Sequence, residues 1–329
     1  MKNFLGLVLL YFMRLTLWFR YRVTIKGLDR INPSVLNKPG GVLFLPNHPT
    51  IFVDPTLVTL AIWKKYPIRP VIVEYMFYTP VINTIMRFMD ALPIPNFVTS
   101  SNSLKKKKAD KIIETIIDDL KHKQNFLIYP AGKTKHQARE VIGASGVHRI
   151  IQSVPDVNVV LVRTTGLWGS RFSRALTAGR APPTMFETIF WGMKKVLTNL
   201  IFFTPRRHVP IELMPAGPDF PFQGSRLEMN RYLERWYNRP DGILPQIGEE
   251  PGESLNLVSY SMWKEELPVV QSRETTVEEI DFSNIPTAIQ EKVKQKLSEM
   301  TQIAPQNIDV NMDLAGDLGL DSLDTAELI

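Results

Sequence analysis

The chain has 329 residues, of which 44% are hydrophobic, and it contains no cysteine. This composition predicts a globular protein with room for two domains, and it excludes disulfides, a thiolate nucleophile and a cysteine-based metal site. The net charge of +6 conceals an asymmetry: residues 274–329 hold twelve Asp and Glu against three Lys, which leaves +15 for residues 1–273.

The positive charge of residues 1–273 and the positions of the histidines limit the ligands and partners that we expect. No interleaved aromatic-basic motif is present, so we expect no nucleic acid; anionic lipid headgroups, phosphorylated substrates and the acidic tail are better partners. The five histidines are too far apart for a recognisable zinc spacing, so no metal is expected.

Residues 4–19 are almost wholly apolar, with Arg14 as the interruption and basic residues on both sides. The run is short for a hydrocarbon core of about 30 Å, and a charged side chain at the bilayer centre costs roughly 2.5–3.5 kcal/mol. We therefore expect residues 1–22 to form a membrane-associated helix in the interface, with Arg14 reaching the headgroups. A buried core helix is the alternative.

Segments typical of strands and helices alternate through residues 23–244. Strands are expected at 22–27, 42–45, 70–74, 125–129, 157–163 and 208–214. Helices are expected at 55–63, 81–89, 105–120, 147–154, 186–203 and 228–237. The alternation predicts an α/β domain in which helices cover a largely parallel sheet.

The apolar run 42–45 ends in a polar corner that carries Asn47, His48 and Asp54. Prolines at 46 and 49 exclude regular structure there, so the strand should deliver His48 to a sheet edge. A histidine beside a carboxylate is the usual general-base pair, because the carboxylate fixes the tautomer and stabilises the imidazolium. Taken alone, the pair also fits a surface loop or a helix cap.

This corner resembles the first motif of the glycerophosphate and lysophospholipid acyltransferase superfamily, in which Asn-His is followed after four residues by Asp. Here five residues separate His48 from Asp54. The resemblance implies that His48 takes the proton of an acceptor hydroxyl and that Asp54 orients the imidazole. It also implies that Asn47 belongs to the substrate-binding residues.

A second corner, residues 129–135 (YPAGKTK), resembles the superfamily's third motif, Phe-Pro-Glu-Gly-Thr-Arg. Gly132 matches, whereas Ala131 and Thr134 stand where Glu and Arg are usual. The resemblance therefore leaves Gly132, Lys133 and Lys135 to bind the acceptor phosphate, the lysines as point charges.

Residues 166–173 (GLWGSRFS) resemble the acyltransferase part of bifunctional acyl-carrier-protein synthetase/acylglycerophosphoethanolamine acyltransferases. The resemblance covers residues from about 20 to 240, so we expect an acyltransferase domain at 23–244. The Pro-, Gly-, Glu- and Ser-rich residues 245–284 are predicted to be a linker.

Residues 317–323 (DLGLDSL) and the helix expected at 286–300 resemble acyl carrier proteins, which implies a partial all-α carrier domain at 285–329. In that family the matching serine, here Ser322, carries 4′-phosphopantetheine. An acidic helix start suits a basic phosphopantetheinyl transferase, although an unmodified capped helix is the alternative. Because half a carrier cannot bury a core, we expect a fragment of a longer protein, with a possible downstream adenylating domain.

Together these features predict an O-acyltransferase at the cytoplasmic face of the inner membrane. It would move a fatty acyl group from an acyl carrier protein or coenzyme A thioester to a lysophospholipid or glycerol phosphate. Direct transfer agrees with the missing cysteine, and a carrier in cis raises the donor concentration to about the mM range. The alternatives are a non-catalytic module that docks acyl chains or membranes for the carrier, and an acceptor that is not a phospholipid.

Overall fold

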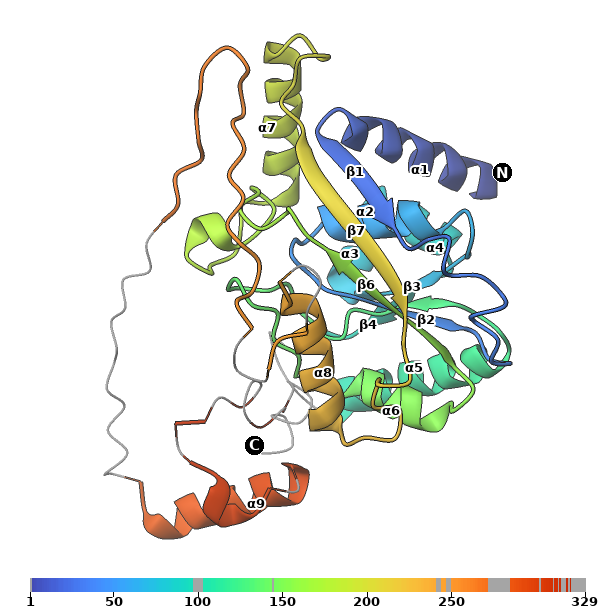
Figure 1. Ribbon diagram of the computed structural model, residues 1–329, viewed down its shortest axis with the longest axis vertical. Helices are drawn as coiled ribbons and strands as arrows, with labels where there is room; N and C mark the ends of the chain where they lie inside the picture. Colours follow the sequence, from blue (N-terminus) through green and yellow to red (C-terminus); the bar gives the residue numbers. More distant parts are fainter. Residues whose placement is uncertain are drawn as a thin grey trace.

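The computed structural model describes residues 2–96, 103–143, 145–240, 244–246, 250–271, 285–301 and 303–309, and residues 311, 312, 314, 318 and 320. A seven-stranded sheet with the order β1-β7-β6-β2-β5-β3-β4 forms the centre (Figure 1). Its strands are β1 Tyr21–Lys26, β2 Val42–Pro46, β3 Arg69–Val73, β4 Leu92–Ile94, β5 Phe126–Leu127, β6 Asn158–Thr164 and β7 Arg207–Pro215.

Helices connect most of these strands. They are α1 Lys2–Trp18, α2 Val53–Ile62, α3 Glu74–Phe77, α4 Ile82–Phe88, α5 Ser103–Lys121, α6 Gly146–Ser153, α7 Met185–Thr198, α8 Arg226–Asn238 and α9 Thr287–Thr301. Short 3₁₀ turns occur at Ala175–Thr177 and Pro305–Asn307. The predicted strands and helices occur in the expected order, strand β4 and the short helix α3 were not predicted, and the α/β class is confirmed.

The sheet is parallel except at one junction. Strands β2 to β6 pair in parallel, β7 runs antiparallel to β6, and β1 pairs in parallel with β7. The beginnings of β1 and β7 therefore lie at the same sheet edge as the ends of β2 and β6. This edge gathers residues from four strands.

Central strand β2 shows why its sequence is continuously apolar. Leu43 and Leu45 join a core cluster with α5, α6 and α8, whereas Val42 and Phe44 join the cluster on the other face with α1, α2 and α4. A strand buried on both faces needs apolar residues at every position. The short run 42–45 was recognisable in the sequence for this reason.

Helix α1 packs with one side on the body and leaves the other exposed. Leu10 is buried, and a Cβ at Gly6 would lie 2.2 Å from the Phe88 ring, so the helix approaches α4 closely. The exposed apolar residues of α1 are Leu7, Val8, Tyr11, Phe12, Leu15 and Trp18. Within the described part of the chain, no helix combines the length and apolarity needed to cross a bilayer. Membrane association of residues 1–22 stays a prediction.

The predicted linker 245–284 needs correction in its first part. Glu250 and Glu253 form ion pairs with Arg139 and Lys135, and Asn256 bonds to the backbone of Trp168. Residues 250–256 therefore pack on the α/β body, because two carboxylates find buried or half-buried cations there. Residues 272–284 lie outside the described residues.

Residues of the predicted carrier form a cluster of their own. Leu297 of α9 packs with Ile308, Leu318 and Leu320. Ser322 lies outside the described residues, as do all residues from 321 onward. The all-α carrier domain therefore stays a prediction.

Candidate active site

His48 and Asp54 meet at the end of β2. The loop after Pro46 turns back, and Asp54 lies in the first turn of α2, where it is fully buried. His48 Nδ1 lies 3.1 Å from Asp54 Oδ2, and 17% of the His48 side chain is exposed. The predicted pair is therefore assembled in spite of the extra residue between its members.

Thr50 holds the carboxylate in place. Asp54 Oδ1 accepts hydrogen bonds from the Thr50 backbone N–H at 2.9 Å and from its hydroxyl at 2.6 Å. The Asp54 backbone N–H donates back to Thr50 Oγ1 at 3.0 Å. Because Oδ1 is already occupied, Oδ2 faces His48 and accepts from Nδ1–H, which leaves Nε2 as the free base.

The loop after β5 covers a second side of His48. The Tyr129 ring packs against the imidazole with centroids 4.2 Å apart, and the Lys135 backbone N–H donates to the His48 carbonyl at 3.0 Å. The two loops meet because β5 pairs in parallel with β2, so both strands end at the same edge. Burial, and then the charge of Asp54, raises the pKa of Tyr129, which keeps its hydroxyl protonated.

Glu140 supports His48 from the backbone side. Its Oε1 accepts the His48 backbone N–H at 3.1 Å, and Asn238 bonds to its backbone N–H and carbonyl at 2.7 and 2.8 Å. Burial raises the pKa of Glu140 to about 7, against the lowering effect of Lys135 and His48. Glu140 Oε2 has no hydrogen-bond partner within the described residues.

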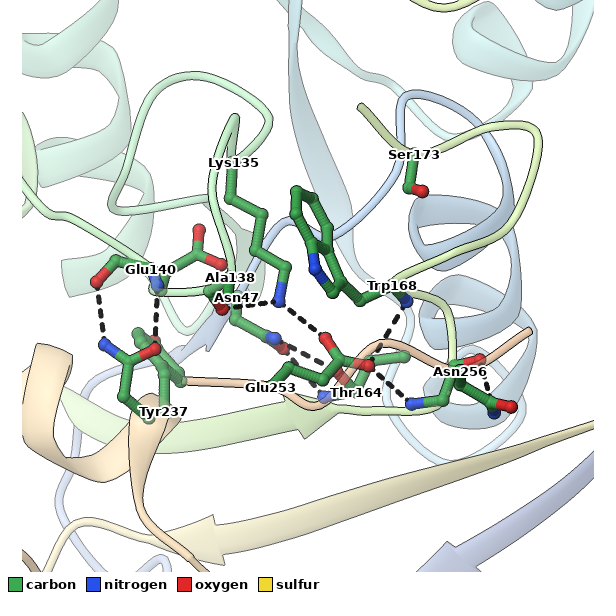
Figure 2. Close-up of polar contacts among 12 residues, drawn as sticks. Asn47, Lys135, Ala138, Glu140, Thr164, Trp168, Ser173, Tyr237, Glu253 and Asn256 are labelled. Carbon is green, nitrogen blue, oxygen red and sulfur yellow. Dashed lines mark hydrogen bonds and ion pairs between the residues drawn. The ribbon is translucent and has the colours of Figure 1, made fainter. Parts of the chain in front are cut away.

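The predicted substrate-binding residues lie in different environments: Asn47 and Lys135 are buried, whereas Gly132 and Lys133 are exposed. The Asn47 amide donates to the Thr164 carbonyl at 2.9 Å and accepts its N–H at 2.7 Å, so it ties β2 to β6 (Figure 2). Gly132, at a φ of 65°, and Lys133 are exposed on the loop that packs against His48. Lys133 forms no ion pair with any residue that the structure describes.

The Lys135 side chain is buried and forms an ion pair inside the protein. Its ammonium lies 2.5 Å from Glu253 Oε2 and 4.9 Å from the centroid of the Trp168 ring, with 3% of the side chain exposed (Figure 2). Glu253 Oε1 in turn accepts the backbone N–H groups of Gly166 and Trp168 at 2.7 and 3.3 Å. The charge expected for the acceptor phosphate at Lys135 is thus already neutralised by a carboxylate.

Sequence reasoning missed Tyr129, Glu140 and Glu253 as residues around the site. In the sequence, Tyr129 is indistinguishable from an ordinary residue at the junction between a buried strand and a loop. Glu140 had no clear signal, since it is a single carboxylate in a stretch, 138–142 (AREVI), without a recognisable period. Glu253 had none, since it lies in a polar stretch far along the chain.

Comparisons with known proteins found two families that match parts of this chain. Residues 22–163 match the family described as Acyltransferase, and residues 291–329 match the family described as Phosphopantetheine attachment site. Among solved structures, the 1-acyl-sn-glycerophosphate (LPA) acyltransferase PlsC from Thermotoga maritima is similar at 16% identity and a TM-score of 0.44. The match covers 72% of this chain and 78% of that one. No curated protein matches significantly. Residues 22–163 thus form a domain of the acyltransferase family, which this chain joins to a phosphopantetheine attachment domain at residues 291–329.

Proposed function

We propose that this protein is an O-acyltransferase whose acceptor is the hydroxyl of a lysophospholipid or a glycerol phosphate. The observation that carries the proposal is the His48–Asp54 pair, with Nδ1 fixed at 3.1 Å from a buried carboxylate and the imidazole partly open to solvent. The donor would be an acyl thioester on a carrier protein or on coenzyme A.

The pair supplies the proton transfers that this reaction needs. Nε2 of His48 takes the proton of the acceptor hydroxyl while its oxygen attacks the thioester carbonyl, and Asp54 stabilises the imidazolium. When the tetrahedral intermediate collapses, the C–S bond breaks, the ester forms, and the imidazolium returns the proton to the leaving thiolate. No side chain of the acyltransferase domain is acylated in this step, in agreement with a chain that has no cysteine.

The carrier would supply the donor in cis. The match of residues 291–329 supports Ser322 as the attachment site of 4′-phosphopantetheine, which carries an acyl group as a thioester when bound. A phosphopantetheinyl transferase would be needed to attach it. Because both regions belong to one chain, the carrier could deliver its acyl group to the acyltransferase domain of the same molecule.

The acylated product is a lipid, and so is a lysophospholipid acceptor, so we place the protein at a membrane surface. Besides the apolar side of α1, a second set of exposed apolar residues belongs to α7 and the turn after it: Phe186, Phe190, Met193, Leu197, Leu200, Ile201, Phe202 and Phe203. The rings of Phe19 and Phe202 lie 6.5 Å apart, so the two sets meet, and Figure 1 shows α1 and α7 at the same end of the molecule. Exposed apolar area of this extent is typical of membrane or protein contacts.

The proposal is tested by the transfer of radiolabelled acyl groups to membrane lipids with wild-type protein and with His48→Ala. We expect His48→Ala to lose transfer by a factor of about 10²–10⁴, the usual contribution of a general base. The control is His122→Ala, since His122 is exposed directly after the end of α5. Unchanged transfer by His48→Ala would favour the non-catalytic docking module.

Mass spectrometry of the product tests the acceptor. We expect a diacylated glycerophospholipid or an acylated glycerol phosphate. Accumulation of an acylated amine, or of an alcohol without a glycerol backbone, would replace the proposed acceptor and leave the acyl transfer itself intact.

A further inference from the structure

A small pocket beside the candidate active site has an unusual lining. It lies between α7, the loop that follows β6, the beginnings of β1 and β7, and the segment that contains Tyr260. Its polar residues are Arg20, Tyr21, Ser170, Arg171, Thr188, Arg207 and Tyr260. Three guanidinium groups therefore border one cavity.

None of these arginines has a carboxylate partner within the described residues. Arg207 is 2% exposed and donates to the backbone carbonyls of Gly166, Gly169 and Asn256 at 2.7–3.1 Å. Arg20 donates to the Pro205 carbonyl. Burial lowers the pKa of both Arg20 and Arg207, because removing a cation from water disfavours its charged form and neither guanidinium has a carboxylate partner of its own among the residues that the structure describes.

Glu253 acts on Arg207 electrostatically, but its carboxylate is already paired with Lys135 at 2.5 Å. Arg171 lies over the Trp191 ring at 4.9 Å, and Arg20 over the Tyr260 ring at 5.2 Å. Aromatic faces hold the guanidinium groups in position but do not neutralise their charge.

The same pocket collects unsatisfied hydrogen-bonding groups. Ser170 Oγ, Arg171 Nε, Thr188 Oγ1 and Tyr260 OH are all buried and have no partner in the part of the chain that the structure describes. Ser170 and Thr188 are 3% and 2% exposed. Buried polar atoms are normally bonded, so four unpartnered groups on residues that line one pocket mark a polar site whose hydrogen-bonding capacity the described residues leave unused.

Topology connects the pocket to His48. Arg20 and Arg207 stand at the beginnings of β1 and β7, which share a sheet edge with the end of β2. The Ile51 backbone N–H donates to the Phe172 carbonyl at 3.4 Å, and the Phe52 and Phe172 rings lie 6.1 Å apart. The pocket loop thus touches the loop that carries His48.

We infer that this pocket binds the phosphate group of the acceptor lipid. The inference rests on the proposed function. A phosphate brings the negative charge and the three or four acceptor oxygens that the arginines and hydroxyls lack, and guanidinium groups match its geometry. It also gives the acceptor a clamp in place of Lys135, whose ammonium is bonded to Glu253.

The position favours the acceptor over the donor. The Arg206 guanidinium lies 4.7 Å from the Trp18 ring centroid, and the apolar sides of α1 and α7 meet near Phe19 and Phe202, beside the beginnings of β1 and β7. A lipid with its acyl chain against these apolar residues would have its phosphate at the pocket and its glycerol hydroxyl toward His48.

The first test measures binding of a short-chain, water-soluble 1-acylglycerol 3-phosphate to the full chain by calorimetry. We expect Arg171→Gln to weaken binding at least about tenfold, the value of one charge-assisted hydrogen bond. The matched control is Arg22→Gln, because Arg22 is an exposed arginine on β1. Binding by Arg171→Gln that equals the wild type would overturn the inference.

A second variant covers the case in which Arg171→Gln fails to fold, as judged by its melting temperature. Ser170→Ala removes only a hydroxyl for which the described residues offer no partner, so the fold should tolerate it while the affinity falls severalfold. Unchanged affinity of a folded Ser170→Ala together with an unfolded Arg171→Gln would count against the pocket.

Ligand controls identify the source of the phosphate. Equal affinity for inorganic phosphate would make the pocket a free-phosphate site, and competition by coenzyme A would assign it to the donor. If Arg171→Gln loses affinity for vesicles that contain phosphatidylglycerol, yet keeps its affinity for the soluble acceptor, the pocket is a membrane anchor. Each of these three results would overturn the acceptor assignment.

Kinetics separate this inference from the proposed function. In Arg171→Gln we expect a raised KM for the acceptor, with kcat and the KM for the donor near wild type. His48→Ala should bind the soluble acceptor normally but not turn over. A wild-type protein that binds and never transfers would refute the proposed function alone, whereas transfer with an unchanged acceptor KM in Arg171→Gln would refute the pocket alone.

Discussion

At the scale of single residues, His48 is constrained at three points. Asp54 fixes Nδ1, Tyr129 covers one face of the ring, and Glu140 holds the backbone N–H. Such constraints reduce the reorganisation needed when the proton moves, because the ring is already oriented in the free protein. The consequences can be tested separately at Asp54 and at Glu140.

Asp54→Asn should leave the fold intact and remove most of the activity. The amide oxygen can still accept from Thr50, but the NH₂ group then faces His48 Nδ1 and forces the other tautomer. We expect kcat to fall about 10³–10⁴-fold with little change in KM, by analogy with such a change in serine proteases. Asp29→Asn, at an exposed position, is the control. A kcat near the wild-type value would mean that Asp54 is a structural cap only.

Glu140 gives the fold a pH dependence. Its pKa is raised from 4.5 to about 7 in the folded protein, so the folded state keeps a proton that the unfolded state loses between these values. The contribution of the protonated carboxyl to the free energy of unfolding is therefore complete below about pH 4.5 and declines as pH rises through about 7, on the order of 3 kcal/mol at most.

Glu140→Gln keeps an oxygen for the His48 N–H and cannot ionise. We expect its melting temperature to fall less than that of the wild type between pH 5 and 8, measured by calorimetry across that range. Glu234, whose pKa burial also raises to about 7, supplies the remaining slope in both proteins. Identical slopes for the two proteins would show that Glu140 is ionised throughout.

At the scale of elements, residues 250–256 complete the edge of the sheet at which His48 lies. Glu253 joins the loop after β5, through Lys135, to the loop after β6, through Gly166 and Trp168. Removing one member of a buried ion pair leaves an uncompensated charge and costs about 3–5 kcal/mol. This segment therefore contributes to the packing around the candidate site.

Glu253→Ala tests that statement by denaturant unfolding. We expect a loss of about 3–5 kcal/mol in the free energy of unfolding, and a smaller loss in Glu253→Gln with Lys135→Met, which leaves no unpaired charge. Glu266→Gln breaks its ion pairs with Lys195 and Lys264 near the surface and should change stability by less than about 1 kcal/mol. A mild effect of Glu253→Ala would show that the segment is dispensable.

The sequence predicted the elements better than their pairing. Continuous apolar runs such as 42–45 and 159–162 reveal strands buried on both faces, and the helices between them follow from apolar spacing. The antiparallel junction between β6 and β7 leaves no trace in such runs, because burial is the same for either direction. The packing of residues 250–256 could not be predicted from the sequence either, because ion pairs between residues far apart in the chain leave no periodic pattern in it.

For the candidate site, too, local features could be predicted from the sequence and contacts between distant residues could not. His48 and Asp54 were predictable because a strand end, two prolines and the spacing of the motif are local features. The role of Lys135 was not, because its partner Glu253 is 118 positions away. The arginine pocket depends on Arg20, Arg171 and Arg207, which only the sheet brings together.

At the scale of the whole molecule, the apolar sides of α1 and α7 predict attachment to vesicles. Phe190 and Phe202 are 68% and 79% exposed, and burying such a ring contributes about 1.5–3 kcal/mol. We expect Phe190→Ser with Phe202→Ser to weaken vesicle binding at least about tenfold in a sedimentation assay. Val35→Ser, at an exposed position outside α1 and α7, is the control. Undiminished binding would exclude α7 from the membrane contact.

The carrier part predicts a covalent modification. Incubation of the full chain with a phosphopantetheinyl transferase and coenzyme A should add the mass of one phosphopantetheine group, and Ser322→Ala should abolish the increment. Ser298→Ala, on α9, is the matched serine control and should keep the increment. An increment that survives in Ser322→Ala would place the attachment elsewhere, and no increment in the wild-type chain would refute modification.

The hydrogen-bonded ring between Thr50 and Asp54 has a consequence for how related sequences are found. Since the carboxylate is anchored by a side chain four positions earlier, and not by the histidine, the turn between them can vary in length while the pair keeps its geometry. A search pattern that demands a fixed interval between histidine and aspartate would reject this chain. A pattern that instead requires a hydroxyl four residues before the aspartate would retain it and would gather other sequences with an expanded turn.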